Sequence, residues 1–243
     1  MNFSSLSCAF FDVDGTLVKG FIIQSFPRYL ADESFIESTY PDKIDRIISD
    51  YDSGKVTYRE AAETIPSLYA LALEGKNVKD VRAWAEKFMR IYLPRHLFSY
   101  SKPLVHNISS LVGVTIAVSG SPIETVTELN DMGFNRIYGS LFEERSGFYT
   151  DKVTANLILG EEKAKCAKRI AKEQNIDLSK SLAFGDTDQD EPLLSLVGLP
   201  FAIQPNKKLR DISTARGWSV LEKSDLNNMN QIIEEIKRKI KSL

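Results

Sequence analysis

Short apolar runs recur along the sequence and alternate with segments of helical periodicity. The first run, residues 8–11, stops at the acidic, glycine-containing stretch 12–16. Further apolar runs lie at residues 113–118, 136–138, 181–184, 200–203 and 219–221, and helical patterns lie at 122–132, 161–174, 207–216 and 227–240. Apolar runs that end at turns indicate buried strands. Because strands alternate with helices, the sequence predicts an α/β fold with a doubly wound, Rossmann-like parallel sheet covered on both faces.

The stretch from residue 21 to residue 94 interrupts this alternation, because it contains no strand pattern. Thr57 and Glu60 have the spacing of a capping box, and apolar residues follow at helical spacing. Pro66 is expected to kink or interrupt this helix, and Pro94 to end the next one. An inserted all-helical cap of roughly 70 to 80 residues has the size of a small accessory domain. The predicted division is a catalytic core of residues 1–18 and 97–243 and a helical cap of residues 19–96.

The composition argues against several classes of function. Lys and Arg number 31 and Asp and Glu 33, for a formal net charge of −2, whereas a nucleic-acid-binding protein needs a basic surface. No apolar run reaches the length of a membrane span, and residues 1–5 do not resemble a secretory signal. The two cysteines, Cys8 and Cys166, are too few for a disulfide framework and are expected to be free thiols. We therefore expect a cytoplasmic protein without a nucleic-acid or membrane partner, and the sequence does not indicate its oligomeric state.

Polar residues suited to catalysis follow the predicted strands. In open parallel sheets, ligands bind beyond the carboxyl ends of the strands. Asp12 and Asp14 follow the first strand, Ser-Gly-Ser at 119–121 follows the second, and an acidic stretch at 185–190 follows the fourth; Lys163 lies in the first turn of the preceding helix. Taken singly, each of these features is more often a turn, a cap or a solvated charge. Their common position at one edge of the sheet favours a functional site.

These groups together suit phosphoryl transfer. Oxygen ligands without His or Cys favour a hard cation, Mg²⁺ before Zn²⁺. A serine hydroxyl, backbone amides at a glycine turn and a lysine suit the oxygens of a phosphoryl group. A carboxylate beside both a metal and a phosphate pocket suggests an aspartyl-phosphate intermediate.

Four segments resemble, in order, the motifs of the haloacid dehalogenase-like hydrolase superfamily, and in particular its phosphoserine phosphatase branch. The segments are 11–18 (FDVDGTLV), 118–121 (VSGS), 160–165 (GEEKAK) and 184–194 (FGDTDQDEPLL). The first and fourth are specific, whereas the second and third count only in this context. A helical cap directly after the first motif also matches this branch. The resemblance implies a Mg²⁺-dependent phosphatase that hydrolyses a small phosphomonoester.

The resemblance assigns the catalytic roles to the first motif. Asp12 would be the nucleophile and a direct Mg²⁺ ligand. Asp14 would protonate the leaving alkoxide and then activate water, and its main-chain carbonyl would also bind the metal. A carbon–halogen hydrolase of the same superfamily is a less suitable alternative, because displacement of halide needs no acid at the position of Asp14.

The other motifs would supply the binding groups. Ser119 and the Gly120 amide would hold the phosphoryl oxygens, and Lys163 would neutralise charge between the nucleophile and the phosphate. Asp186 would bind Mg²⁺, and Asp190 would bind it directly or through water. A phosphotransferase or phosphomutase differs only in the acceptor and stays open. A non-catalytic protein that binds a phosphorylated ligand is the alternative least consistent with these intact residues.

The cap departs from the phosphoserine phosphatase pattern. Those enzymes carry a Glu early in the cap that holds the substrate amine, whereas this chain has Phe21 near that place and no carboxylate in residues 19–24. An ammonium group left unpaired against an apolar side chain costs on the order of several kcal/mol. We therefore predict that phosphoserine is a poor substrate and that less charged or partly apolar phosphomonoesters are preferred. Glu33 or Glu60 would supply the missing charge if either folded back into the cleft, so a phosphoserine phosphatase proper stays open as an alternative.

Overall fold

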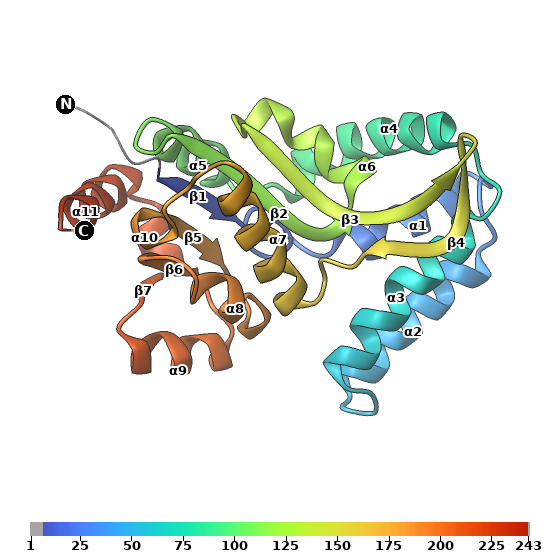
Figure 1. Ribbon diagram of the computed structural model, residues 1–243. Coiled ribbons are helices and arrows are strands. Elements are labelled where there is room, and N and C mark those ends of the chain that lie inside the picture. Colours follow the sequence, from blue (N-terminus) through green and yellow to red (C-terminus); the bar gives the residue numbers. More distant parts are fainter. Residues whose placement is uncertain (1–6, 243) are drawn as a thin grey trace.

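The structure, a computed structural model, describes residues 7–242 and contains one seven-stranded sheet (Figure 1). The strand order is β4-β3-β2-β1-β5-β6-β7, and neighbouring strands are parallel except β3 and β4. The strands are β1 (Cys8–Phe11), β2 (Val114–Pro122), β3 (Arg136–Arg145), β4 (Phe148–Ala155), β5 (Leu182–Gly185), β6 (Leu199–Ile203) and β7 (Ser219–Leu221). This sheet confirms the predicted α/β core, and each of the predicted strands is present.

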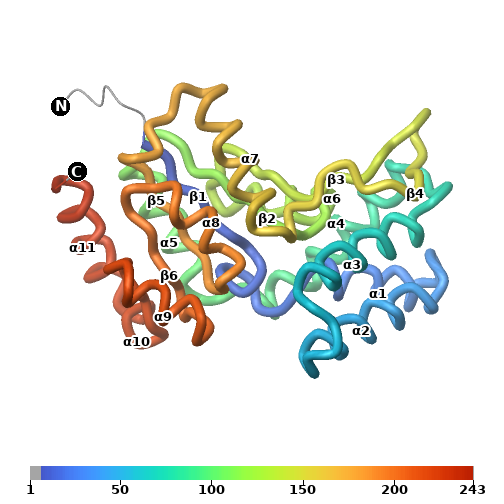
Figure 2. Tube along the Cα trace, turned by 60° about the horizontal axis from the view of Figure 1, so that its bottom comes forward, coloured from blue at the N-terminus to red at the C-terminus, as the bar shows by residue number. Residues whose placement is uncertain are grey.

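β4 is the strand that the sequence pattern missed. It pairs antiparallel with β3, and the turn between them places Ser146 and Gly147 at positive φ (52° and 84°). Most side chains of β4 are exposed or half-buried, so the strand has no apolar run to reveal it. A backbone bridge joins Phe148 of β4 to Asn77 in the helical insertion. The β3–β4 hairpin therefore reaches out from the sheet edge to the inserted helices, as Figure 2 shows.

Helices cover both faces of the sheet, as a doubly wound fold requires. Cys8 and Phe10 of β1 point into one apolar core and Ala9 and Phe11 into the other, because successive side chains of a strand alternate. The first core is closed by α7 (Gly160–Glu173), α8 (Glu191–Leu194) and α9 (Lys207–Arg216). The second is closed by α5 (Ser101–Ser109), α6 (Ile123–Val126), the 3₁₀ helix η1 (Thr127–Met132), α10 (Lys223–Leu226) and α11 (Met229–Lys241). Since β1 lies between β2 and β5, the carboxyl ends of these three strands are adjacent.

A helical insertion separates β1 from β2 and packs beside the core (Figures 1 and 2). Its helices are α1 (Ile22–Asp32), α2 (Thr39–Asp52), α3 (Tyr58–Leu73) and α4 (Val78–His96). This confirms the predicted helical insertion after the first strand. The chain enters and leaves it at neighbouring points, because the Lys19 N–H donates to the His96 carbonyl (2.8 Å) and Val18 forms a bridge with Leu97. We propose that the cap consists of residues 19–96 and that its two boundaries lie at these contacts.

Proline does not break the cap helices where the sequence predicts a break. α3 is continuous through Pro66, and α4 runs past Pro94, so the helix end predicted there is wrong. A proline inside a helix leaves the carbonyl four residues earlier without its usual donor. At Pro66 this carbonyl belongs to Ala62, and the side-chain amide of Asn156 donates to it at 2.8 Å. At Pro94 it belongs to Arg90, an exposed residue that solvent reaches. At Pro66, another donor is therefore available to the freed carbonyl.

One buried carboxyl group lies between the core and the hairpin. Glu124, in α6, is 4% exposed; the Tyr149 hydroxyl of β4 donates to its Oε1, and its Oε2 has no hydrogen-bond partner. Burial raises the pKa of Glu124 above its ordinary value of 4.5. Above pH 4.5 the unfolded chain therefore releases a proton that the folded protein still holds. The contribution of Glu124 to the free energy of unfolding falls as the pH rises from there through its raised pKa.

Replacing Glu124 with Gln should remove this pH dependence. We expect the stability of Glu124→Gln relative to the natural protein to increase as the pH rises above 4.5, because only the natural protein has to ionise a buried group. Urea denaturation of both proteins over a series of pH values measures the difference. Parallel stability profiles across that range would show that Glu124 ionises as easily in the folded chain as in the unfolded one.

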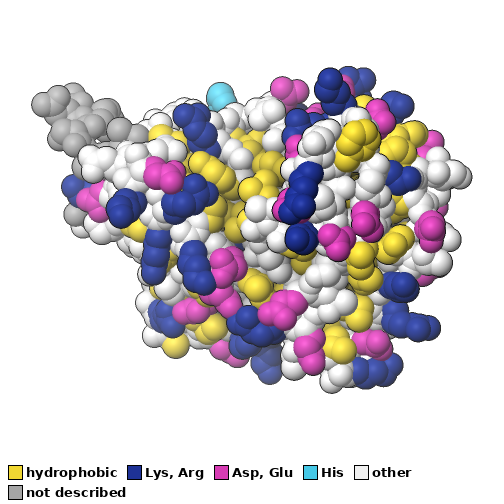
Figure 3. Space-filling model, turned by 45° about the vertical axis from the view of Figure 1, so that its right-hand side comes forward, with side chains coloured by type: hydrophobic (Ala, Val, Ile, Leu, Met, Phe, Trp, Pro, Cys, Tyr) yellow, Lys and Arg dark blue, Asp and Glu magenta, His cyan; other side chains and the backbone are white. Residues whose placement is uncertain are grey.

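The described residues contain no helix that is both long and apolar enough to cross a membrane. On the face drawn in Figure 3, cationic and acidic side chains are interspersed rather than gathered by sign. Both Cys8 and Cys166 are buried free thiols, as predicted. The prediction about a secretory signal in residues 1–5 lies outside the described residues.

Candidate active site

The turn after β1 brings the first motif against the end of β5. The Asp12 N–H still donates to the Phe184 carbonyl (2.9 Å), so Asp12 stays fixed to the sheet after the strand ends. The next turn depends on Gly15, whose φ is +87°. A Cβ at this position would lie 2.3 Å from Oδ2 of Asp186. Only glycine has both the conformation and the space that let the loop pass so close to Asp186.

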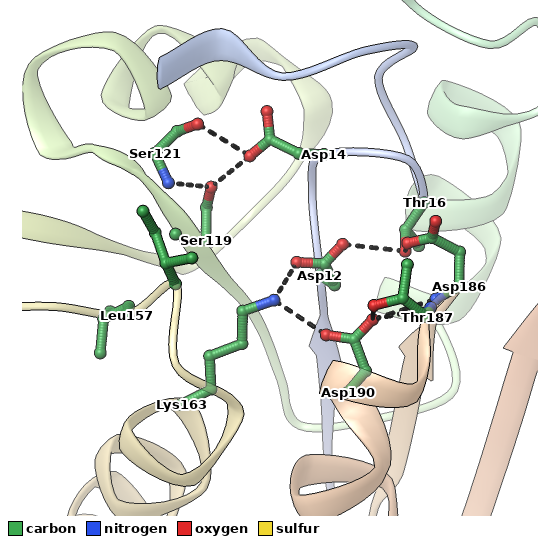
Figure 4. A network of polar contacts seen from close by, with 12 residues as sticks. Asp12, Asp14, Thr16, Ser119, Ser121, Leu157, Lys163, Asp186, Thr187 and Asp190 are labelled. Carbon is green, nitrogen blue, oxygen red and sulfur yellow. Dashed lines mark hydrogen bonds and ion pairs between the residues drawn. The ribbon is translucent and has the colours of Figure 1, made fainter. Parts of the chain in front are cut away.

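Three carboxylates meet at the adjacent ends of β1 and β5 (Figure 4). Asp12, Asp186 and Asp190 each place a carboxylate oxygen within 4.8 Å of the others. Oδ2 of Asp190, in the 3₁₀ helix η3 (Asp188–Asp190), accepts the backbone N–H groups of Asp186 and Thr187 (3.1 and 3.2 Å). The Thr16 hydroxyl lies 3.0 Å from Asp12 and 2.8 Å from Asp186. The loop that carries each carboxylate is therefore held in place by local hydrogen bonds.

Lys163 points into this cluster from the first turn of α7. Its Nζ is 2.5 Å from Oδ1 of Asp12 and 2.8 Å from Oδ1 of Asp190, and the residue is 6% exposed. Burial alone would lower the pKa of Lys163, but the two carboxylates outweigh burial and raise the pKa well above its usual value. The lysine is therefore a fixed positive charge beside Asp12.

The cluster carries more negative charge than Lys163 balances. Three carboxylates and one ammonium leave two negative charges when all are ionised. Burial raises the pKa of Asp12 to about 7 although the Lys163 charge opposes this shift. Burial, reinforced by the charges of Asp12 and Asp190, raises the pKa of Asp186 to about 9. A divalent cation would relieve this repulsion, and a donor set made only of oxygen atoms fits Mg²⁺.

Asp14 lies apart from the other carboxylates and faces the second motif. Its Oδ2 accepts the hydroxyl groups of Ser119 (2.8 Å) and Ser121 (2.9 Å), as Figure 4 shows. Its Oδ1 accepts the N–H of Ile22, the first residue of α1, whose N-cap Phe21 has no side-chain cap. Burial raises the pKa of Asp14, although these hydrogen bonds oppose the shift. Asp14 thus joins the second motif to the first helix of the cap.

A cavity of about 250 Å³ opens above these groups. Asp12, Asp14 and Lys163 line its floor with Gly120 and Ser121, whereas the predicted phosphate ligand Ser119 is fully buried behind Asp14 and does not line it. Sequence reasoning assigned no role to Ser121 or Thr16, although both lie inside the quoted motifs. The sequence feature that indicates a role for these two residues is a hydroxyl side chain inside a motif.

The cap and the core share the remaining wall of the cavity; the core part consists of Ile158, residues 187–190 and Asn206. Side-chain contacts join the cap to the core around the cavity. The Tyr58 hydroxyl donates to the Ile158 carbonyl (2.5 Å), and both residues line the cavity. Arg59 forms an ion pair with Glu161 of α7. These contacts join the start of α3 to the segment that carries Lys163.

Comparisons with known proteins find a matching family, related sequences and a related structure. Residues 9–195 match the protein family described as haloacid dehalogenase-like hydrolase. The phosphoserine phosphatase SerB1 of Mycobacterium tuberculosis is 26% identical over 218 residues, which make up 88% of this chain and 70% of that protein. The histidinol-phosphatase of Neisseria meningitidis serogroup C is 23% identical over 219 residues, 88% of this chain and 97% of that protein.

The fold also matches a solved structure, described as a phospho-aspartyl intermediate analogue of phosphoserine phosphatase. The TM-score is 0.66, the sequences are 18% identical, and the match covers 94% of this chain and 99% of the other. At this identity the likeness establishes the fold alone.

Proposed function

Because the chain belongs to the haloacid dehalogenase-like hydrolase family, we propose that it is a Mg²⁺-dependent phosphatase that hydrolyses a small phosphomonoester through an aspartyl-phosphate. The observation that carries this proposal is the cluster of three carboxylates with Lys163. Asp12, Asp190 and Lys163 of this cluster line the cavity, and Asp186 lies behind the lining residues. The relatives support the reaction class, since one is named a phosphoserine phosphatase and another a histidinol-phosphatase. Because those two names give different leaving groups, they support phosphate-ester hydrolysis more than a particular substrate.

In the proposed first step, an oxygen of Asp12 attacks phosphorus while the bond from phosphorus to the leaving oxygen breaks. Asp14 donates its proton to that oxygen, and the raised pKa of its buried carboxyl group favours the protonated form that this step requires. Lys163 and the Gly120 amide would hold the phosphoryl oxygens. Asp12, Asp186 and Asp190, with the main-chain carbonyl of Asp14, would hold Mg²⁺, which would supply positive charge to the phosphoryl oxygens.

The second step returns the enzyme to its starting state. Asp14, now ionised, accepts a proton from water as the water oxygen attacks phosphorus. The bond between phosphorus and Asp12 breaks, and inorganic phosphate leaves. The contacts of Tyr58 and Arg59 with the segment before Lys163 support a cap that closes over the reacting groups and limits access of other water. Two buried free thiols are consistent with action in the cytoplasm, which we propose as its location.

Phosphate release from a panel of phosphomonoesters, measured with purified protein and Mg²⁺, tests the proposed function. We expect inorganic phosphate and the free alcohol in equal amounts. Added sugars and alcohols distinguish a phosphotransferase, for which the phosphoryl group would appear on the acceptor instead of as phosphate. The proposal fails if no phosphomonoester in the panel is cleaved.

The acid role of Asp14 predicts a dependence on the leaving group. General acid catalysis contributes about 10²- to 10⁴-fold to a rate when the leaving group is a strong base. Asp14→Asn should therefore slow hydrolysis of an alkyl phosphate by at least about 100-fold, and that of nitrophenyl phosphate much less, because nitrophenolate leaves without a proton. The measurement is kcat for both substrates with both proteins. Equal losses on the two substrates would assign Asp14 a structural role, such as its capping of α1.

A further inference from the structure

The part of the cavity wall that the cap supplies is almost entirely apolar. Ile23 comes from α1, Ile48 from α2, and Ala62 and Ile65 from α3, and Ile158 faces them from the core. Ile23 and Ile65 belong to a small apolar cluster of the cap, against which Ile48 and Ile158 pack. This wall lies beyond the groups that would hold the phosphate, so it would contact the leaving group of a bound substrate.

Aromatic side chains continue this wall toward the solvent. Tyr51 and Tyr58 pack edge to face with ring centroids 5.9 Å apart, and both line the cavity. Phe21 also lines the cavity and is 52% exposed. Its position is fixed by the start of α1, where the N–H groups of Ile22 and Ile23 donate to Asp14 and Ser121 (2.8 and 3.2 Å). The mouth of the cavity is therefore aromatic.

Charged groups that could hold a charged leaving group are absent from the inner wall. Among the described residues that line the cavity, Lys163 is the only cation, and Asp12 and Asp190 already pair with it. Asp188 pairs with Lys208 (2.7 Å). The cap contributes a single carboxylate, that of Asp52, and this residue is exposed at the end of α2.

Glu33 and Glu60, which the sequence analysis considered as partners for a substrate ammonium group, lie outside the cavity. Glu60 forms the predicted capping box with Thr57, whose N–H donates to it at 2.7 Å, and Glu33 is the C-cap residue of α1. Neither residue lines the cavity. Asp14 also lines the cavity, but its oxygens already accept hydrogen bonds from Ser119, Ser121 and Ile22. The ammonium and carboxylate of a bound phosphoserine would therefore both lack a free buried partner of opposite charge.

We infer that the cap selects phosphomonoesters with an uncharged, apolar leaving group, either an alkyl chain or a ring. This inference rests on the proposed phosphatase function and adds the chemical class of the alcohol. Apolar surface of the substrate is removed from water against the isoleucine wall, and each buried methylene favours binding by about 0.8 kcal/mol, roughly fourfold in affinity. A charge in the same place would lose its hydration without gaining a partner.

A series of straight-chain alkyl phosphates, from ethyl to hexyl, tests the inference with the unmodified protein and Mg²⁺. The basicity of the leaving alkoxide changes little along this series, so a trend in kcat/KM reports contact with the wall. We expect kcat/KM to rise roughly three- to fourfold per methylene until the cavity is filled. Phosphoserine should lie at least about tenfold below propyl phosphate, which has a similar chain without the charges.

Two neighbouring isoleucines provide a matched pair of variants. Ile48 and Ile47 are both half-buried residues of α2, but only Ile48 lines the cavity. Ile48→Ser should lower the ratio of kcat/KM for hexyl to ethyl phosphate by at least about fourfold, the value of one lost methylene contact. Ile47→Ser should leave that ratio unchanged, since any general cost to folding affects both substrates equally.

The outcomes separate this inference from the function on which it rests. The inference is overturned if kcat/KM does not change along the alkyl series, or if phosphoserine is preferred over propyl phosphate. Turnover that requires Asp12 would still uphold the proposed phosphatase in either case. Absence of turnover with every phosphomonoester overturns the phosphatase. Equal changes in Ile48→Ser and Ile47→Ser would also count against the apolar wall as the specificity element.

Discussion

Replacing Asp12 with Asn is expected to abolish hydrolysis of every phosphomonoester. An amide cannot form the acyl phosphate, and loss of a covalent nucleophile lowers kcat on the order of 10⁴-fold or more. Asp12 also balances the charge of Lys163 at 2.5 Å and is one of the three clustered carboxylates. The substitution therefore removes the proposed nucleophile and also changes the electrostatics of the proposed phosphate site.

Phosphate release and the mass of the protein quenched during turnover measure this effect. The natural protein should gain the mass of a phosphoryl group, and Asp12→Asn should not. Glu124→Gln is a suitable control because Glu124 is also a buried carboxyl group but does not line the cavity; it should keep its turnover. Phosphorylation of Asp12→Asn at a comparable rate would place the nucleophile at another residue.

Removal of divalent cations is expected to eliminate activity, and Mg²⁺ is expected to restore it. When all three carboxylates are ionised, the two negative charges that Lys163 leaves unbalanced would repel the phosphate dianion as well as each other. Mn²⁺ should substitute for Mg²⁺, whereas Ca²⁺ should support little activity because it prefers more ligands at longer distances. The measurement is the rate of phosphate release after chelation and after addition of each cation.

Binding of the cation can be followed without substrate. Because the three clustered carboxylates repel one another when ionised, Mg²⁺ should raise the midpoint of thermal unfolding. Asp186→Asn should weaken this stabilisation, whereas Asp188→Asn should retain it, because Asp188 pairs with Lys208 outside the cluster. Full activity after exhaustive chelation would contradict the metal requirement, whatever the unfolding experiment shows.

The accuracy of the fold prediction depended on the type of signal in each segment. The central strands have apolar residues on both sides because helices cover both faces of the sheet, so their sequences stand out as apolar runs. β4 is an edge strand with largely exposed side chains and has no such run. A local pattern could not show that α3 continues through Pro66, because the compensating donor, Asn156, lies far away in the sequence.

The sequence also predicted only part of the candidate site. Asp12, Lys163, Asp186 and Asp190 were predicted as one group, and the structure brings their side chains together. The role of Asp14 as the cap of α1 could not be predicted, because it depends on how the helix start packs against the second motif.

The sequence by itself determined which chemical groups come to one edge of the sheet. Parallel strands in one sheet all end at the same edge, which brings the residues that follow them to that edge. Those that directly follow β1, β2 and β5 are neighbours because β1 lies between the other two strands. Only the tertiary structure decided how these groups are paired and what faces them. The 2.8 Å contact of Lys163 with Asp190 and the isoleucine wall across the cavity both arise from packing between distant segments. Such contacts depend on side-chain positions to within an ångström, and local sequence patterns specify only the element on which each side chain lies.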